Sequence, residues 1–148
     1  MNLEIDRYCF VCGPENPQGL HAQFECGEGK ARVRFVPQAE HQGYAGVSHG
    51  GIVTALLDEA MVYAATSLGC WTATAEITVR FRRPVPTSQE LIVTAEVVRQ
   101  QRRIIECRAE AHSPDGTLLA TAIGKLMQGR SLTDGERETR QALGDVER

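Results

Sequence analysis

A pair of glycines and one acidic side chain are the residues of this sequence best placed to act on a carbonyl group. Gly50 and Gly51 follow His49 at the start of a helical pattern, and Asp58 lies seven residues beyond Gly51. The first N–H groups of a helix lack partners inside the helix, and glycine lets a ligand oxygen approach them closely. The helix dipole adds positive potential there, so this helix start could polarise a carbonyl and stabilise an oxyanion.

Asp58 is the candidate group to attack or to activate a water. At a rise of 1.5 Å per residue, Gly51 and Asp58 are about 10 Å apart along the helix axis. One carbonyl group cannot contact both. We therefore expect a site between two subunits, in which one chain supplies the Gly51 amide and the other supplies Asp58. Asp58 would either attack the carbonyl directly or deprotonate a water, and the sequence agrees with both roles.

The only strong helical pattern in the sequence covers residues 49–68. Ser48 can cap its N-terminus and Gly69 can close its end. At about 100° per residue, apolar side chains share one broad face: Val53, Leu56, Leu57, Ala60, Met61, Tyr63, Ala64 and Leu68. The other side carries small, weakly polar groups: Thr54, Ala55, Asp58, Val62 and Ala65. This is not an ordinary solvated face, so we expect a partner subunit or a ligand to cover it.

Strand-like runs lie on both sides of this helix. Two precede it, at residues 20–27 and 30–36, and four follow it, at residues 72–82, 90–99, 103–112 and 117–128. One helix cannot cover both faces of a parallel sheet. An antiparallel sheet curled around one helix satisfies the pattern, which predicts an α+β protein. We expect a turn-rich entry segment over residues 1–19, the main domain over 20–128, and a charged tail or short surface helix over 129–148.

Residues 46–60 resemble the HGG-to-Asp signature of hotdog thioesterases, and the nearest branch is the phenylacetate-degradation (PaaI) type. The run Thr74-Ala75-Glu76-Ile77-Thr78-Val79-Arg80-Phe81-Arg82-Arg83-Pro84 resembles the strand that follows the helix in that branch. Cys9-x-x-Cys12-Gly13 and Asn16-Pro17-x-Gly19-Leu20 resemble a lead-in seen in some members. The likeness covers residues 9–128. It implies the hotdog fold, a curved antiparallel sheet of about six strands wrapped around one long central helix.

The resemblance also implies an activity. The chain would hydrolyse an acyl-CoA-type thioester to a free acid and the CoA thiol, as a homodimer or a dimer of dimers. Asp58 would be the key carboxylate, with no cofactor besides the coenzyme A of the substrate. His49 would support the loop and contact the thioester, or only hydrogen-bond the loop.

Thr74 aligns with a position where this branch carries Ser or Thr to hold the attacking water. Strand alternation, however, puts Thr74 on the same face as Arg80 and Arg82, opposite the apolar Ile77 and Val79. Thr74 reaches the site only if its face joins the dimer interface or if a β-bulge intervenes. A plain strand threonine is the alternative.

Three further groups are candidate substrate contacts. Glu59 is the rival acid, because some hotdog branches place a glutamate on this helix. Related enzymes carry an asparagine six residues before the histidine. Here that position is Gly43, and the adjacent Gln42 could replace it as a donor. Arg80, Arg82 and Arg83 form a compact basic cluster that could pair with the phosphates of CoA, or be a solvated strand face.

Composition excludes several other classes. A net charge of −3 and a pI near 5.8 argue against a nucleic-acid binder. No apolar run approaches the roughly 20 residues of a membrane span, and the first residues do not resemble a signal peptide. The number of cysteines is odd, which favours reduced thiols in the cytosol: Cys9, Cys12, Cys26, Cys70 and Cys107. Cys9 and Cys12 could hold zinc with His21 and Cys26, but a lone CxxC is weak evidence, and we predict no metal.

Two other functions compete with hydrolysis. A hotdog domain could bind acyl-CoA as a sensor without cleaving it, and such a domain would not need a carboxylate facing the ligand. Asp58 therefore favours the enzyme. A hotdog dehydratase would use a histidine and acid pair in a different motif, which this sequence does not show. The fold alone would not separate these functions, whereas the site does.

Overall fold

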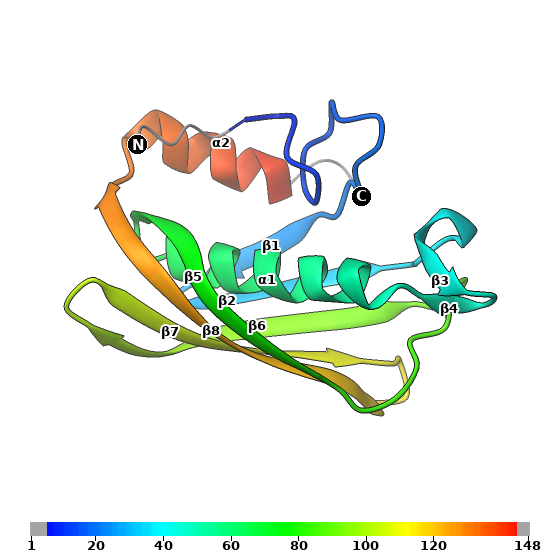
Figure 1. The fold of residues 1–148 in the computed structure, drawn as a ribbon. Helices are drawn as coiled ribbons and strands as arrows, with labels where there is room; N and C mark the ends of the chain where they lie inside the picture. The colour runs from blue at the N-terminus through cyan, green and yellow to red at the C-terminus, as the bar shows by residue number, and fades with distance from the viewer. Residues whose placement is uncertain (1–5, 145–148) are drawn as a thin grey trace.

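One curved antiparallel sheet and a long helix dominate the computed structural model, which describes residues 6–144 (Figure 1). The sheet has six strands, each antiparallel to its neighbours. Their order across the sheet is β1 (Phe24–Gly27), β2 (Lys30–Phe35), β6 (Leu91–Gln101), β7 (Ile104–His112), β8 (Leu118–Ser131) and β5 (Cys70–Phe81). The predicted count and direction of the strands are confirmed.

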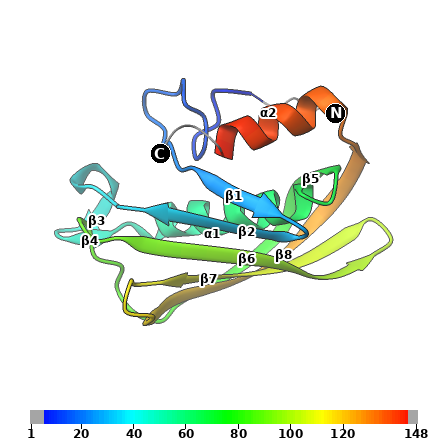
Figure 2. The ribbon, with the colours of Figure 1, turned by 180° about the vertical axis from the view of Figure 1, so that it is seen from behind.

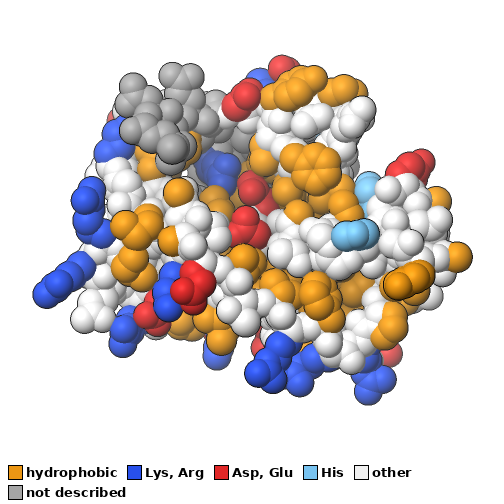
Figure 3. All heavy atoms as spheres, viewed as in Figure 1, with side chains coloured by type: hydrophobic (Ala, Val, Ile, Leu, Met, Phe, Trp, Pro, Cys, Tyr) orange, Lys and Arg blue, Asp and Glu red, His pale blue; other side chains and the backbone are white. Residues whose placement is uncertain are grey.

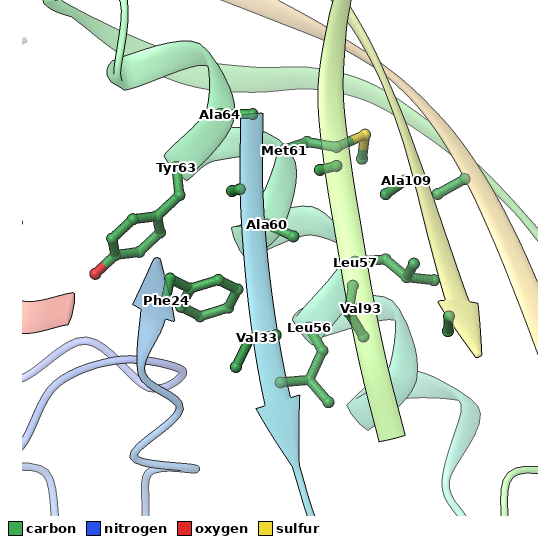
Figure 4. Packing of buried hydrophobic residues seen from close by; sticks show 14 of the residues in the cluster. Phe24, Val33, Leu56, Leu57, Ala60, Met61, Tyr63, Ala64, Val93 and Ala109 are labelled. Atoms are coloured by element: carbon green, nitrogen blue, oxygen red, sulfur yellow. The ribbon is translucent and has the colours of Figure 1, made fainter. Parts of the chain in front are cut away.

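The helix α1 (Gly50–Thr66) lies in the concave side of this sheet. Its apolar face is fully buried, with Leu56, Leu57 and Met61 packed against sheet residues such as Val93 (Figure 4). Burial of an aliphatic side chain contributes about 1.5–3 kcal/mol, so this contact supplies much of the stability of the fold. The predicted arrangement of one helix inside a curled sheet is confirmed.

The ends of α1 differ slightly from the prediction. His49, and not Ser48, is the N-cap. Ser48 lies in the short strand β4 (Val47–Ser48), where its N–H donates to the Val85 carbonyl and its side chain is buried. It therefore cannot reach the first turn. At the other end the helix stops at Thr66, and Gly69 follows with φ of 93°.

The segment 38–48, which lies between the predicted strand 30–36 and the predicted helix, contains a 3-10 turn, η1 (Ala39–His41), and a small hairpin of β3 (Gln42–Tyr44) with β4. The first strand is shorter than predicted. Residues 20–22 bond to the entry segment instead, through the amides of Leu20 and Ala22 and the carbonyls of Phe10 and Val11. The strand predicted over 90–99 extends to Gln101, and the turn that follows lies at residues 102–103, where Arg102 has φ of 56°.

A second layer covers one end of α1. It consists of the entry segment and the helix α2 (Asp134–Gly144), which lie on the same side of the molecule in both views (Figures 1 and 2). Residues 129–131 of the predicted tail belong to β8, and residues 134–144 form α2. Residues 1–5 and 145–148 of the two predicted end segments lie outside the described residues. Within residues 6–144, neither helix has the length and hydropathy to cross a membrane.

Candidate active site

The start of α1 is held by His49. The Gly51 N–H donates to Nδ1 of His49 at 2.8 Å, and the amides of Ile52 and Val53 donate to the His49 carbonyl oxygen. The Gly50 amide is the remaining donor of this turn, with no hydrogen-bond partner among residues 6–144. The helix start thus presents one open N–H, and a second that is occupied by an exposed imidazole.

The 3-10 turn η1 and the β3–β4 hairpin fix the position of His49. The His49 N–H donates to the His41 carbonyl at 2.7 Å, and a Cβ at Gly43 would lie 3.4 Å from the His49 Cα. Gln42 has a local role, because its carboxamide oxygen accepts the Gly46 N–H at 3.0 Å and closes the turn. Its role as a substrate donor stays a prediction.

A groove of about 470 Å³ opens beside the helix start. His49 and Gly50 line it together with the predicted phosphate contacts Arg82 and Arg83, while Arg80 is not part of its wall. Arg80, Arg82 and Arg83 are exposed and form no ion pair with any described residue. The structure therefore brings two of the three arginines to the same groove as the helix start.

Three groove residues were not predicted as contacts. Tyr44 and Phe81 line the groove with exposed aromatic rings, 84% and 54% exposed, and Ser48 places a buried hydroxyl there without a hydrogen-bond partner. In sequence, Phe81 fits the apolar alternation of its strand. Only the nearby glycines Gly43 and Gly46 hint that Tyr44 lies next to a turn. Large exposed aromatic groups in a groove are typical ligand contacts.

A β-bulge in β5 resolves the difficulty over Thr74. The register with β8 shifts between Thr74 and Glu76, which leaves Ala75 as the extra residue. Before the bulge, even-numbered residues such as Thr72 point inward. After it, Ile77 and Val79 do so and pack against the core. The bulge thus puts Thr74 on the inner face and Arg80 on the outer one.

Thr74 and Asp58 are joined directly. The Thr74 hydroxyl donates to Oδ1 of Asp58 at 2.7 Å, linking β5 to the middle of α1. Asp58 is half-buried, and burial raises the pKa of its carboxyl group above the ordinary value, while the Thr74 hydrogen bond opposes this rise. Its neighbours Ala55 and Val62 on this side of α1 are also half-buried. In the view of Figure 3, acidic side chains show at the centre of this face among hydrophobic ones.

Glu59 points to different partners. Its Oε1 lies 3.3 Å from the Cys12 Sγ and 3.7 Å from the Arg140 guanidinium. Burial raises the pKa of Glu59 to about 7, although the positive charge of Arg140 opposes that rise. The second layer of the fold therefore covers Glu59, while Asp58 stays with Thr74.

A second depression, of about 520 Å³, lies over β1, β2, β6 and β7, away from the start of α1 and from Asp58. Charged side chains line it, and some of them neutralise one another, as Arg108 and Glu96 do. None of the predicted site residues contributes to it.

Comparison with known proteins identifies related sequences and folds. The sequence matches the family model of the thioesterase superfamily over residues 45–120, which include the start of α1, Asp58 and Thr74. It is 29% identical over 100 residues to an inferred esterase of Archaeoglobus fulgidus. That match covers 68% of this chain and 65% of the relative, so the chain spans somewhat less than two thirds of its length.

Solved structures share the fold. The PaaI protein of E. coli, from the phenylacetic acid degradation operon, is 27% identical with a TM-score of 0.72, covering 77% of this chain and 84% of that one. PA5202 of Pseudomonas aeruginosa is 29% identical with a TM-score of 0.69, covering 74% and 90%. A hypothetical thioesterase of Streptococcus pneumoniae, crystallised with coenzyme A, has a TM-score of 0.73 at 18% identity, covering 76% and 91%. The hotdog fold expected from the sequence is confirmed.

The Thr74 hydrogen bond gives a test of the Asp58 environment. Replacing Thr74→Val removes a donor that favours the ionised carboxylate, so the pKa of Asp58 should rise further. Because that pKa already lies above the value of 3.8 for an unperturbed aspartate, ionisation opposes folding, and the variant should lose more stability than the parent as pH rises.

The pKa can be followed by NMR titration of the Asp58 carboxyl carbon. Thr78→Val is the matched control, since Thr78 lies on the same strand but is exposed. Equal Asp58 titration in the parent, the Thr74 variant and the control would contradict the role given to Thr74.

Proposed function

Because this chain belongs to the thioesterase superfamily, we propose that it is an acyl-CoA thioesterase, which hydrolyses an acyl-CoA-type thioester to a free acid and the CoA thiol. The observation that carries the proposal is the half-buried Asp58 carboxylate, oriented at 2.7 Å by Thr74 on the surface of α1. A carboxylate held in this way among small apolar groups is suited to nucleophilic or general-base work.

Asp58 can act by either of two routes. In the first, one carboxylate oxygen attacks the thioester carbonyl, expels the CoA thiolate and forms an anhydride that water then hydrolyses. In the second, Asp58 removes a proton from a water that attacks the carbonyl. Thr74 orients the carboxylate in both routes through its bond to Oδ1, which leaves Oδ2 for the reaction.

The carbonyl oxygen would be bound at the start of α1. The open Gly50 amide is one donor, and the Gly51 amide becomes a second once the exposed His49 ring turns away from it. Both amides lie at the positive end of the helix dipole, where negative charge that develops on the oxygen is stabilised. In the absence of substrate, His49 thus caps the helix start by accepting the Gly51 N–H.

A second subunit would complete the site. The helix start and Asp58 of one chain are separated by about 10 Å along α1, too far for one carbonyl. Pairing two chains through the side of α1 that carries Ala55, Asp58 and Val62 would bring each Asp58 to the helix start of the partner. These side chains are small and only half-buried within one chain, which suits close approach of a second helix. We therefore propose a homodimer or a dimer of dimers.

The groove beside His49 is the proposed place for the CoA part of the substrate. Arg82 and Arg83 offer guanidinium groups that no described acid neutralises, and phosphate pairs with arginine strongly. The fold-level neighbour from Streptococcus pneumoniae that was crystallised with coenzyme A supports this substrate class. Arg80 lies outside the groove, so we propose for it only a peripheral contact with CoA.

One observation favours a second candidate function. The Gly51 amide is already bonded to His49, and a domain that only binds acyl-CoA would not need to free it. The two functions differ in their dependence on Asp58, because binding does not require a carboxylate that faces the thioester.

Asp58→Asn should therefore lower kcat/KM for acyl-CoA hydrolysis by about 10²–10⁴-fold, which is the contribution typical of a general base. Thiol release from short, medium, long and aromatic acyl-CoAs measures this and also finds the preferred acyl group. Asp134→Asn is the matched control, because Asp134 is exposed at the start of α2, and it should keep parental activity. Hydrolysis by the Asp58 variant at the parental rate would overturn the assignment.

Arg82→Gln with Arg83→Gln should raise KM for acyl-CoA about tenfold or more with a smaller change in kcat, since phosphate contacts act mainly on binding. The parental KM should also rise with added salt, as expected for charge pairing. Arg32→Gln is the control, because Arg32 is exposed on β2, away from the groove. An unchanged KM in the double variant would place the CoA phosphates elsewhere.

A further inference from the structure

Three side chains that the proposed reaction does not use converge beneath the second layer. The Glu59 Oε1 lies 3.3 Å from the Sγ of Cys12 and 3.9 Å from the Sγ of Cys9. All three potential ligand atoms lie within 4.8 Å of one another. Two thiols and a carboxylate from segments 47 residues apart in the sequence thus meet at one point.

A tight turn brings the two thiols to the same side of the entry segment. The Gly13 N–H donates to the Cys9 carbonyl at 2.9 Å, which closes the turn over Cys9-x-x-Cys12. A Cβ at Gly13 would lie 2.3 Å from the Cys9 nitrogen, and this backbone cannot move aside cheaply. Glycine is therefore required after the second cysteine, and the turn is built to present both sulfur atoms together.

We propose that Cys9, Cys12 and Glu59 bind a zinc ion. With Zn–S bonds of about 2.3 Å and Zn–O bonds of about 2.1 Å, a tetrahedral site separates sulfur and oxygen ligands by about 3.6 Å. The two observed S···O distances, 3.3 and 3.9 Å, lie on either side of this value. Zinc also suits a mixture of thiolate and carboxylate ligands.

Arg140 of α2 balances the charge of this cluster. Two thiolates and a carboxylate with Zn²⁺ carry a net charge of −1, and the Arg140 guanidinium lies 3.7 Å from the Glu59 oxygen. Both side chains are largely buried, 15% and 13% exposed for Arg140 and Glu59. A neutral assembly avoids the large cost of burying an unpaired charge.

The Tyr63 hydroxyl lies against the same cluster. Tyr63 is fully buried, its ring lies between Phe24 and the Arg140 guanidinium, and its hydroxyl makes no geometrically regular hydrogen bond among residues 6–144 but interacts with the Cys12 side chain. Figure 4 shows the Tyr63 ring extending beyond Phe24, with its oxygen at the edge of the labelled core. Buried polar groups are usually hydrogen-bonded. A water on the fourth position of zinc would give this hydroxyl a regular hydrogen bond.

The ion would tie the entry segment to α1 at the residue next to Asp58. We predicted no metal because a lone CxxC is weak evidence, and the partners considered for the pair were His21 and Cys26. Neither belongs to the cluster, and His21 contacts the Asn16 carbonyl instead. Glu59 is the third ligand, and only the fold brings it to the cysteines.

Cobalt binding to the full chain tests the proposal. The reduced, metal-stripped protein should bind one Co²⁺ per chain with a thiolate-to-cobalt charge-transfer band and the visible bands of a tetrahedral site, and Zn²⁺ should abolish these bands by displacing Co²⁺. Cys12→Ser and Glu59→Gln should each weaken binding at least about tenfold. Cys70→Ala and Glu76→Gln are matched controls outside the cluster and should bind as the parent does.

The parental spectrum decides the question even if a variant fails to fold. Absence of the charge-transfer band in the reduced parent would overturn the proposal, as would unaltered cobalt binding in folded Cys12→Ser. A Cys9–Cys12 disulfide in protein prepared in reducing buffer would overturn it too, since both thiolates are needed as ligands.

Discussion

The packing of α1 into the concave side of the sheet is the constraint on which the other features depend. This helix must bury one apolar face against six strands, so its orientation is fixed along its whole length. Its start, its outer side and Glu59 are fixed with it. Gly50, Gly51 and Asp58 are therefore positioned by a core element, and within one chain the proposed mechanism requires only the exposed His49 ring to move.

The same constraint explains why a single chain offers only half of each proposed site. A straight helix cannot bring Gly51 and Asp58 to one carbonyl, but two such helices side by side can. The structure divides the outer side of α1 accordingly. The entry segment and α2 cover the end near Glu59 and Tyr63, while Ala55, Asp58 and Val62 remain half-buried. Ala65, which lies on the side that the sequence assigned to a partner or a ligand, is fully buried within the chain.

Periodicity predicted the helix, the six strands and their antiparallel arrangement, because these depend on which residues must be buried. Features that depend on pairing between distant segments were not visible. Alternation alone put Thr74 on the outer face, since the bulge at Ala75 arises only from the register of β5 against β8. Glu59 met Cys12 only in three dimensions. The start of α2 was not predicted, although Thr133 and Glu136 form a capping box through the Thr133 hydroxyl and the Glu136 carboxylate, a pattern that indicates a helix start.

The central claim is that the helix start of one subunit and Asp58 of another form one site, and subunit mixing tests it most directly. Gly51→Val and Asp58→Asn chains, each inactive alone, would be unfolded together and refolded in equal amounts. About half of the refolded dimers should be mixed, and each mixed dimer holds one intact site of two. About a quarter of the parental thioesterase activity should therefore return. Activity that stays at the level of the separate variants, although mixed dimers have formed, would contradict a site shared between subunits.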